Sequence, residues 1–236
     1  MGIKKTLTSL ALSGALALVV LGLAGKVKAS PLFLDDFETG TASRWINQNG
    51  GWQIVNDNGN HVYQQDGLNR GGEKWTGAVA NFSGKNYNNA EADMRALEEG
   101  DFGMTLSIFS SSDRVVTAST DDFISLAMFP RYNQVSLYVN NSGEGSGTIE
   151  YALQMPIEQN RWYHTKIEVE NGLINASIDG QTLFSNIPTN LTQGYVCLST
   201  DGLKADFDNV KITPEPTTMG LLALGGLGLL TKRRSK

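Results

Sequence analysis

The sequence contains one cysteine, Cys197, and two histidines, His61 and His164. A single cysteine excludes a disulfide within the chain, so folding has to rely on a hydrophobic core. One cysteine and two histidines are also too few for the nitrogen and sulfur ligand sets that are typical of zinc sites. His164 stands between Tyr163 and Thr165 in a predicted strand, where we expect an exposed or hydrogen-bonded ring. The sequence therefore predicts neither a disulfide scaffold nor a zinc enzyme.

Basic residues are scarce in the central part of the chain. Removing residues 1–29 and 214–236 takes away eight of the 19 basic residues and one of the 24 acidic residues, which leaves a net charge near −12. Nothing in this central part interleaves Arg or Lys with aromatic residues. These features exclude nucleic acid as a partner bound through the net field. The remaining stretch of about 184 residues is long enough for one domain, and its charge suits a surface protein that uses divalent cations.

The N-terminus has the layout of a secretory signal peptide. Lys4 and Lys5 precede an uncharged stretch from Thr6 to Gly25, and small residues follow it. We predict a signal peptide over the first 29 residues, cleaved between Ala29 and Ser30. A retained membrane anchor is the alternative, because about twenty uncharged residues almost span a bilayer.

A second uncharged stretch, from Pro216 to Thr231, lies near the C-terminus. As a helix it would reach about 24 Å, against a hydrocarbon core of about 30 Å. Four glycines weaken it, and a basic tail would hold its end on the cytoplasmic side. A polar spacer, a short apolar tail and a basic end are typical of sorting signals that are removed after recognition. We expect a short transmembrane segment at about 217–231 that crosses the inner membrane transiently; a permanent anchor is the alternative.

The C-terminal motif resembles the PEP-CTERM sorting signal of Gram-negative bacteria. Its three parts occur in the family's order at the end of the chain. The resemblance implies processing by an exosortase, export across the inner membrane, and delivery to the cell surface or the extracellular matrix. The motif residues are Pro214, Glu215, Pro216, Lys232, Arg233 and Arg234.

The central part, residues 30–213, has a hydrophobic period of two. Apolar and polar residues alternate over 104–108, 135–139, 166–170 and 174–178, which predicts half-buried strands. The stretch FISLAMF, Phe123 to Phe129, is apolar in both phases and predicts a central strand. Asn171-Gly172 and Asp179-Gly180 supply the positive φ angles that tight hairpins need. The sequence predicts an all-β fold of about a dozen strands, a two-sheet β-sandwich or jelly roll.

Several segments of this part resemble concanavalin A-like lectins and glucanases, in particular their laminin G-like branch. The segments are LDDFETG, EADMR, RWYHTKIEVENGLINASIDGQTLF and GYVCLSTDGLKADFDNVKI, in that order. The resemblance implies a jelly roll whose first and last strands pair, so that LDDFE and DFDNV lie side by side.

Glucanases of this fold carry Glu-x-Asp-x-Glu, whose two glutamates act as nucleophile and acid/base. The nearest match here is incomplete, because Glu91 and Asp93 are followed by Arg95 where the second glutamate should stand. Glu168 and Glu170 also share a face, which we interpret as a solvated strand face. We therefore expect no catalytic residues. The alternative is a glycoside hydrolase whose carboxylate pair the sequence does not reveal.

Acidic residues near both ends of the domain would converge if the terminal strands pair. Carboxylate ligands without sulfur or imidazole favour Ca²⁺, and the resemblance also implies a structural calcium. Solvated carboxylates on edge strands are the alternative. The candidate ligands are Asp36, Glu38, Asp206 and Asp208.

Carbohydrate binding needs exposed aromatic rings together with polar side chains that pair with hydroxyl groups. Trp52 and Trp162 lie in strand patterns that predict core positions. The sequence favours an exported, non-catalytic protein with a carbohydrate-binding or structural domain and a polysaccharide partner, but it leaves the ligand open. The candidate sugar contacts are Trp45, Trp75, Arg131 and Tyr132.

Overall fold

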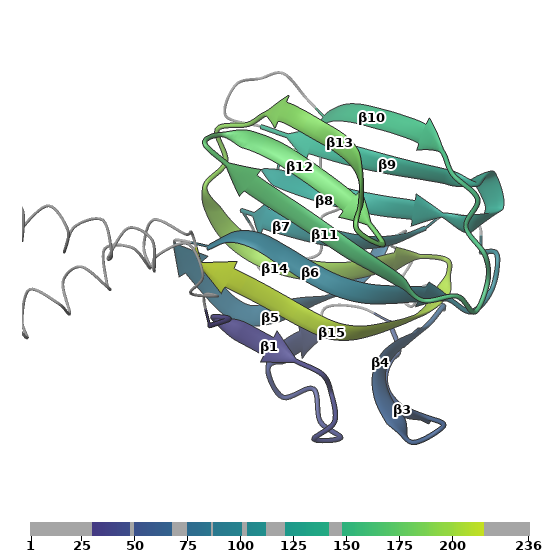
Figure 1. Ribbon diagram of the computed structural model, residues 1–236. Coiled ribbons are helices and arrows are strands. Elements are labelled where there is room, and N and C mark those ends of the chain that lie inside the picture. Colours follow the sequence, from purple (N-terminus) through teal and green to yellow (C-terminus); the bar gives the residue numbers. More distant parts are fainter. Residues whose placement is uncertain are drawn as a thin grey trace, which may run out of the picture. The chain divides into compact units, whose positions relative to one another are not determined.

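The alternating segments form two antiparallel sheets that stack on each other in the computed structural model (Figure 1). The structure describes residues 30–47, 50–67, 75–85, 87–100, 103–111, 121–141 and 148–214. The domain forms one unit, Pro31–Glu215. The predicted signal peptide and the apolar stretch at 217–231 lie outside the described residues. Within them, no helix is long and apolar enough to cross a membrane.

Sheet A lies in front in Figure 1 and sheet B behind it. Both match the predicted two-sheet sandwich, which is confirmed. In order, sheet A contains β13 (Gln181–Pro188), β12 (Leu173–Ile178), β11 (Tyr163–Glu170), β6 (Tyr87–Ala96), β15 (Lys204–Pro214), β4 (Asn60–Asp66) and β3 (Trp52–Asp57), with β1 (Phe33–Asp35) also paired to β15. Sheet B contains β10 (Thr148–Gln154), β9 (Gln134–Asn140), β8 (Phe123–Phe129), β7 (Met104–Ser110), β14 (Gln193–Asp201), β5 (Trp75–Lys85) and β2 (Trp45–Asn47).

The first and last strands pair as predicted. β1 runs antiparallel to β15, with Phe33 opposite Ile212 and Asp35 opposite Val210. The two predicted hairpin turns are also present, since Asn171 and Asp179 have positive φ angles of 53° and 51°. β8 is buried along its whole length between β7 and β9, which confirms it as a central strand.

An aromatic cluster fills one region of the core between the sheets. Trp45 packs against Phe33 and Phe37, and its Nε1 donates a hydrogen bond to Asp35 Oδ2 at 2.9 Å. Only 6% of Trp45 is exposed. Because both its ring and its N–H group are satisfied inside the protein, Trp45 is a core residue and does not present the exposed face that a sugar contact needs. Trp52 is in the core as predicted.

A buried ion pair joins three strands on the outer face of sheet A. Arg95 Nε donates to Asp206 at 3.1 Å, and its Nη2 donates to Asp57 at 2.8 Å. The side chain of Asp206 is 1% exposed. Trp162, predicted as core, is instead half-buried on this face, with its ring 4.6 Å from the Arg95 guanidinium. The position where a glucanase would carry its second glutamate therefore holds the counter-ion of Asp206.

We expect Arg95→Met to lower the free energy of unfolding by about 3–5 kcal/mol, because it leaves the buried Asp206 carboxylate without its cation. Arg161→Met is the matched control. Arg161 also contacts two carboxylates, Glu158 and Asp179, but its side chain is 46% exposed, so the loss should stay below about 1 kcal/mol. Urea unfolding followed by tryptophan fluorescence measures both values. Equal losses would contradict the assignment of Arg95 as a structural ion-pair residue.

Candidate functional site

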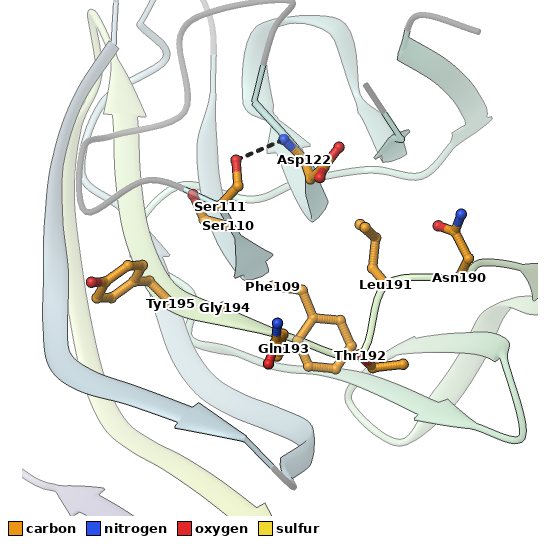
Figure 2. Close-up of a pocket in the computed structure, with 10 residues that line it drawn as sticks. All are labelled: Phe109, Ser110, Ser111, Asp122, Asn190, Leu191, Thr192, Gln193, Gly194 and Tyr195. Carbon is orange, nitrogen blue, oxygen red and sulfur yellow. Dashed lines mark hydrogen bonds between the residues drawn. The ribbon is translucent and has the colours of Figure 1, made fainter. Parts of the chain in front are cut away.

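A pocket opens at one end of sheet B, where β7 ends and β8 and β14 begin (Figure 2). Its volume is about 450 Å³. Figure 2 shows Ser111 and Asp122 on one side, with Phe109, Gln193 and Leu191 facing them across the space. The loop between β13 and β14 supplies another part of the wall. The described lining residues are Phe109, Ser110, Ser111, Asp122, Asn190, Leu191, Thr192, Gln193, Gly194 and Tyr195.

Beside the pocket, the backbone of β7 and that of β14 are both irregular, and the buried side chain of Tyr87 contacts both. The Tyr87 hydroxyl accepts a hydrogen bond from Phe109 N–H at 3.1 Å and donates to the Gly194 carbonyl at 3.2 Å. Phe109 has a φ angle of 55°, and β14 shifts register between Tyr195 and Cys197. Burial raises the pKa of Tyr87, so its hydroxyl stays protonated and can both donate and accept. Tyr87, a side chain of sheet A, therefore holds the backbone that lines the pocket in sheet B.

The described pocket wall is polar but carries little charge. Ser111 and Asp122 close the wall through two hydrogen bonds, from Ser111 N–H to the Asp122 carbonyl and from Asp122 N–H to Ser111 Oγ. The other polar side chains are hydroxyls and amides, and Asp122 carries the one carboxylate among the described lining residues. None of these residues is Lys, Arg or His. Such a wall suits a neutral, hydroxyl-rich ligand.

The outer face of sheet B lacks a carboxylate pair in the described residues. Its inner strands carry hydroxyls that bond to one another, such as Ser107 to Ser125 at 2.9 Å. Glu150 on β10 and Asp201 on β14 are the carboxylates of this face, and four strand spacings separate them, or about 19 Å. Glycoside cleavage needs carboxylates about 5–9.5 Å apart. Glu150 instead accepts hydrogen bonds from Ser136 and Tyr138, at 2.8 Å and 2.9 Å.

Glu91 and Asp93 of the incomplete glucanase motif lie on the outer face of sheet A. His164 on the neighbouring strand β11 contacts both, with Nδ1 2.7 Å from Asp93 Oδ1 and Nε2 3.9 Å from Glu91 Oε2. Lys211 also contacts Glu91 at 3.1 Å. Both carboxylates of the incomplete motif are therefore engaged by neighbouring side chains. The hydrogen-bonded role expected for His164 is confirmed.

The four candidate calcium ligands do not form one cluster. Asp206 is bound by Arg95, and Asp36 accepts a hydrogen bond from Glu38 N–H in an exposed turn. Glu38 and Asp208 lie near enough that Glu38 contributes to raising the Asp208 pKa. Among the described residues, no group of three or more acidic, histidine or cysteine side chains could hold a metal ion. Calcium stays a prediction that rests on Glu38 and Asp208 alone.

The other candidate sugar contacts lie away from the pocket. Arg131 and Tyr132 belong to the turn Pro130–Tyr132, which follows β8 at the end opposite to Asp122. Tyr132 is 51% exposed. Trp75 begins β5, and its side chain lies outside the described part of the structure. Sequence reasoning missed the pocket residues; the polar residues Asn190, Thr192 and Gln193, in the loop before β14 and at its start, are the signal that could have indicated them.

Comparison with known proteins identifies the sorting signal and the fold. Residues 213–234 match the PEP-CTERM protein-sorting motif. Thr213 and Pro214, its first two residues, are the end of β15. The other predicted motif residues, from Glu215 onward, lie outside the described residues, as does Ala29 of the predicted cleavage site; Ser30 is exposed. A search of the curated proteins finds no match to the sequence.

Solved structures with similar folds include both binding and hydrolytic proteins. A Bacillus subtilis protein of unknown function with a galectin-like fold has a TM-score of 0.62 at 14% identity, covering 79% of this chain and 97% of that chain. The carbohydrate-binding module CBM66 from Bacillus subtilis has a TM-score of 0.53 at 17% identity (72% and 95% covered). A Bacillus licheniformis β-glucanase has a TM-score of 0.57 at 13% identity (80% and 100%). These similarities establish the jelly-roll fold.

We expect Tyr87→Phe to lower the free energy of unfolding by about 1–3 kcal/mol, because the buried Phe109 N–H group loses its acceptor. Tyr163→Phe should cost a similar amount, since Tyr163 is equally buried and its hydroxyl accepts from Glu158 N–H at 2.7 Å. Only the first change should alter the pocket. Hydrogen exchange of the Phe109 and Ser110 amides checks this: faster exchange in both variants would show that Tyr87 has no local role.

We expect Asp208→Asn to become more stable relative to the natural protein as pH rises. Burial is the main cause of the raised Asp208 pKa; hydrogen bonds from Asn60 and Asn209 oppose it, and Asp93 and Glu38 add to it. The folded protein holds the Asp208 carboxyl proton more tightly than the unfolded chain does. The protonated Asp208 therefore stabilises the fold fully below its ordinary pKa of 3.8, and this stabilisation is lost as pH rises through the folded-state pKa. Urea unfolding from about pH 4 to pH 7 measures the difference. A difference independent of pH would refute this assignment.

Proposed function

We propose that the protein is delivered to the cell surface and that its jelly-roll domain binds a polysaccharide there without cleaving it. The observation that carries this proposal is the pocket at the end of sheet B, whose described wall offers hydroxyl, amide and aromatic groups but one carboxylate, Asp122. Hydroxyl groups of sugars pair well with such side chains, and an aliphatic or aromatic surface packs against the C–H faces of the ring.

Binding without cleavage is supported by the same wall and by the outer face of sheet B. Hydrolysis of a glycosidic bond uses one carboxyl group as an acid and a second as a nucleophile or base. Asp122 is the one acidic residue among the described lining residues, and four strand spacings separate Glu150 from Asp201. Binding is therefore the chemistry that the described residues support.

Delivery to the surface is supported by the sorting motif at 213–234. We propose that an exosortase processes this motif after the chain has entered the inner membrane, in a Gram-negative cell. The basic residues at the end of the motif would stay on the cytoplasmic side until processing, by the positive-inside rule. The polysaccharide partner would then belong to the cell surface or to the extracellular matrix.

Glycoside hydrolysis is the second candidate. Glu91 and Asp93 share one face of β6, both contact His164, and are the part of the glucanase motif that the chain keeps. For this pair to act, Asp93 would have to release His164 and Glu91 would have to release Lys211. Fold similarity to a β-glucanase does not decide between these functions, because one fold hosts many activities.

A polysaccharide array combined with a reducing-sugar assay tests the proposal. We expect binding to at least one polysaccharide, with no release of reducing sugar. Asp122→Asn should weaken binding, whereas the double variant Glu91→Gln/Asp93→Asn should leave it unchanged. Release of sugar that the double variant abolishes would establish the second candidate instead. The lack of binding to every polysaccharide on the array would reject the binding function.

A further inference from the structure

We infer that two copies of the chain associate through the free edge of sheet B, where β10 of one copy pairs antiparallel with β10 of the other. This association goes beyond the proposed function, because it concerns a protein partner of the domain and not its ligand. Three properties of β10 support it: the outward direction of its backbone groups, the lack of features that protect an edge, and the self-complementary order of its side chains.

β10 is the end strand of sheet B and pairs with β9 along Thr148–Gln154 without a register shift (Figure 1). The Met155 N–H group donates to the Asn133 carbonyl and continues this ladder by one residue. Because hydrogen-bonded and non-hydrogen-bonded pairs alternate in an antiparallel ladder, the backbone groups of the odd-numbered residues of β10 face β9. Those of the even-numbered residues, from 148 to 154, therefore face outward, where another strand can pair with them.

The outward edge of β10 carries little that would keep another strand away. Natural sheets protect their edges with proline, lysine, bulges or very short strands. β10 contains no proline, lysine or arginine and has no bulge. Its one charged residue, Glu150, is engaged on the β9 side, because its carboxylate accepts hydrogen bonds from Ser136 and Tyr138. β10 is therefore a regular, unprotected edge.

Two other edge strands of the described sheets are protected. At the opposite end of sheet B, β2 has three residues. At one edge of sheet A, the pairing of β13 with β12 is interrupted by register shifts, and β13 ends at Pro188. The contrast with these strands singles out β10 as an edge on which a partner strand can add.

The side chains of β10 complement a second copy of the same strand. A two-fold axis beside Tyr151 pairs all seven residues of the strand with those of the other copy. Glu150 then faces Ala152 of the other copy, and Ile149 faces Leu153 of the other copy. Ile149 is 44% exposed, so the pairing removes an apolar side chain from water. Apolar residues thus meet on one face of the strand, and neither carboxylate faces the other.

The neighbouring registers fit less well. Registers that keep the outward hydrogen bonds differ in steps of two, and the nearest ones pair only residues 148–152 or 150–154 of each copy. The first of these sets the two Glu150 carboxylates directly opposite each other, which destabilises a strand pair. The axis beside Tyr151 is therefore the register that the sequence of β10 favours.

Disulfide cross-linking of the full-length chain, in a detergent whose micelles outnumber the protein, tests the pairing. At the two-fold axis Tyr151 forms a non-hydrogen-bonded pair with its own copy, with Cα atoms about 4.5 Å apart, which a disulfide can bridge. We expect Tyr151→Cys to form a linked dimer on oxidation. Ser185→Cys, at an exposed position on the protected edge strand β13, is the matched control and should not. The natural Cys197 is buried, and its burial raises its pKa to about 12, so it should not react.

Charge variants at Ala152 test the register without touching the core. Ala152→Lys places a cation opposite Glu150 of the other copy and should lower the dimer dissociation constant roughly fivefold; Ala152→Glu should raise it by a similar factor. Ala152→Pro removes an outward N–H group and should abolish the dimer. Ser185→Lys and Ser185→Glu are the controls and should leave the dissociation constant unchanged. Sedimentation velocity over a dilution series of each full-length variant measures these values.

Each contrary outcome rejects the inference. A chain that stays monomeric at every concentration, or that cross-links equally through Tyr151→Cys and Ser185→Cys, does not pair through β10. A dimer that Ala152→Pro leaves intact uses another surface. If Ala152→Lys and Ala152→Glu both weaken the dimer, Ala152 faces its own copy and the inferred register is wrong. Polysaccharide binding is measured separately, so none of these outcomes decides the proposed function.

Discussion

Sheet A depends on the pairing of its last strand, β15, with three others. One edge of β15 pairs with β6, and the other edge pairs with β4 along Lys204–Phe207 and with β1 along Val210–Ile212. The register shift after Asp208 lets one strand serve both partners. Asn60 bridges from β4 to Asp208, and Arg95 bridges from β6 to Asp206. The acidic residues of β15 thus fasten the sheet, which explains why two of the candidate calcium ligands are engaged by protein groups.

The candidate site depends on irregular backbone, in contrast to the regular ladders around it. Tyr87 reaches from sheet A into the region where β7 and β14 depart from regular pairing, and its hydroxyl satisfies backbone groups that the ladder leaves without partners. Substituting a side chain that holds such a distortion lowers the stability of the fold. While it is present, the same side chain shapes the ligand site. The regular part of sheet B carries small hydroxyl residues and no carboxylate pair in the described strands.

The fold could be predicted because its signals are local. Alternation along Ile174–Ile178 and the Asn171-Gly172 turn act within a few residues, so the sequence displays them directly. The three-residue strands β1 and β2 are too short to show a period. The burial of Trp45 and of Trp162 was not predictable, because each depends on distant partners: Trp45 contacts Asp35 and Phe33 in the core, and Trp162 packs on Arg95 at the outer face of sheet A. The pocket combines residues from three separate segments, so no single stretch of the sequence predicts it.

The position of β15 in sheet A also determines when this sheet can be completed during folding. Because β15 pairs with β6, β4 and β1, sheet A cannot close until the strand next to the sorting motif has arrived. Thr213 and Pro214 belong both to this strand and to the motif. In a chain that is threaded across a membrane from its N-terminus, sheet A would therefore be completed only when the motif itself reaches the membrane. Completion of sheet A and arrival of the sorting signal would coincide, because Thr213 and Pro214 belong to both.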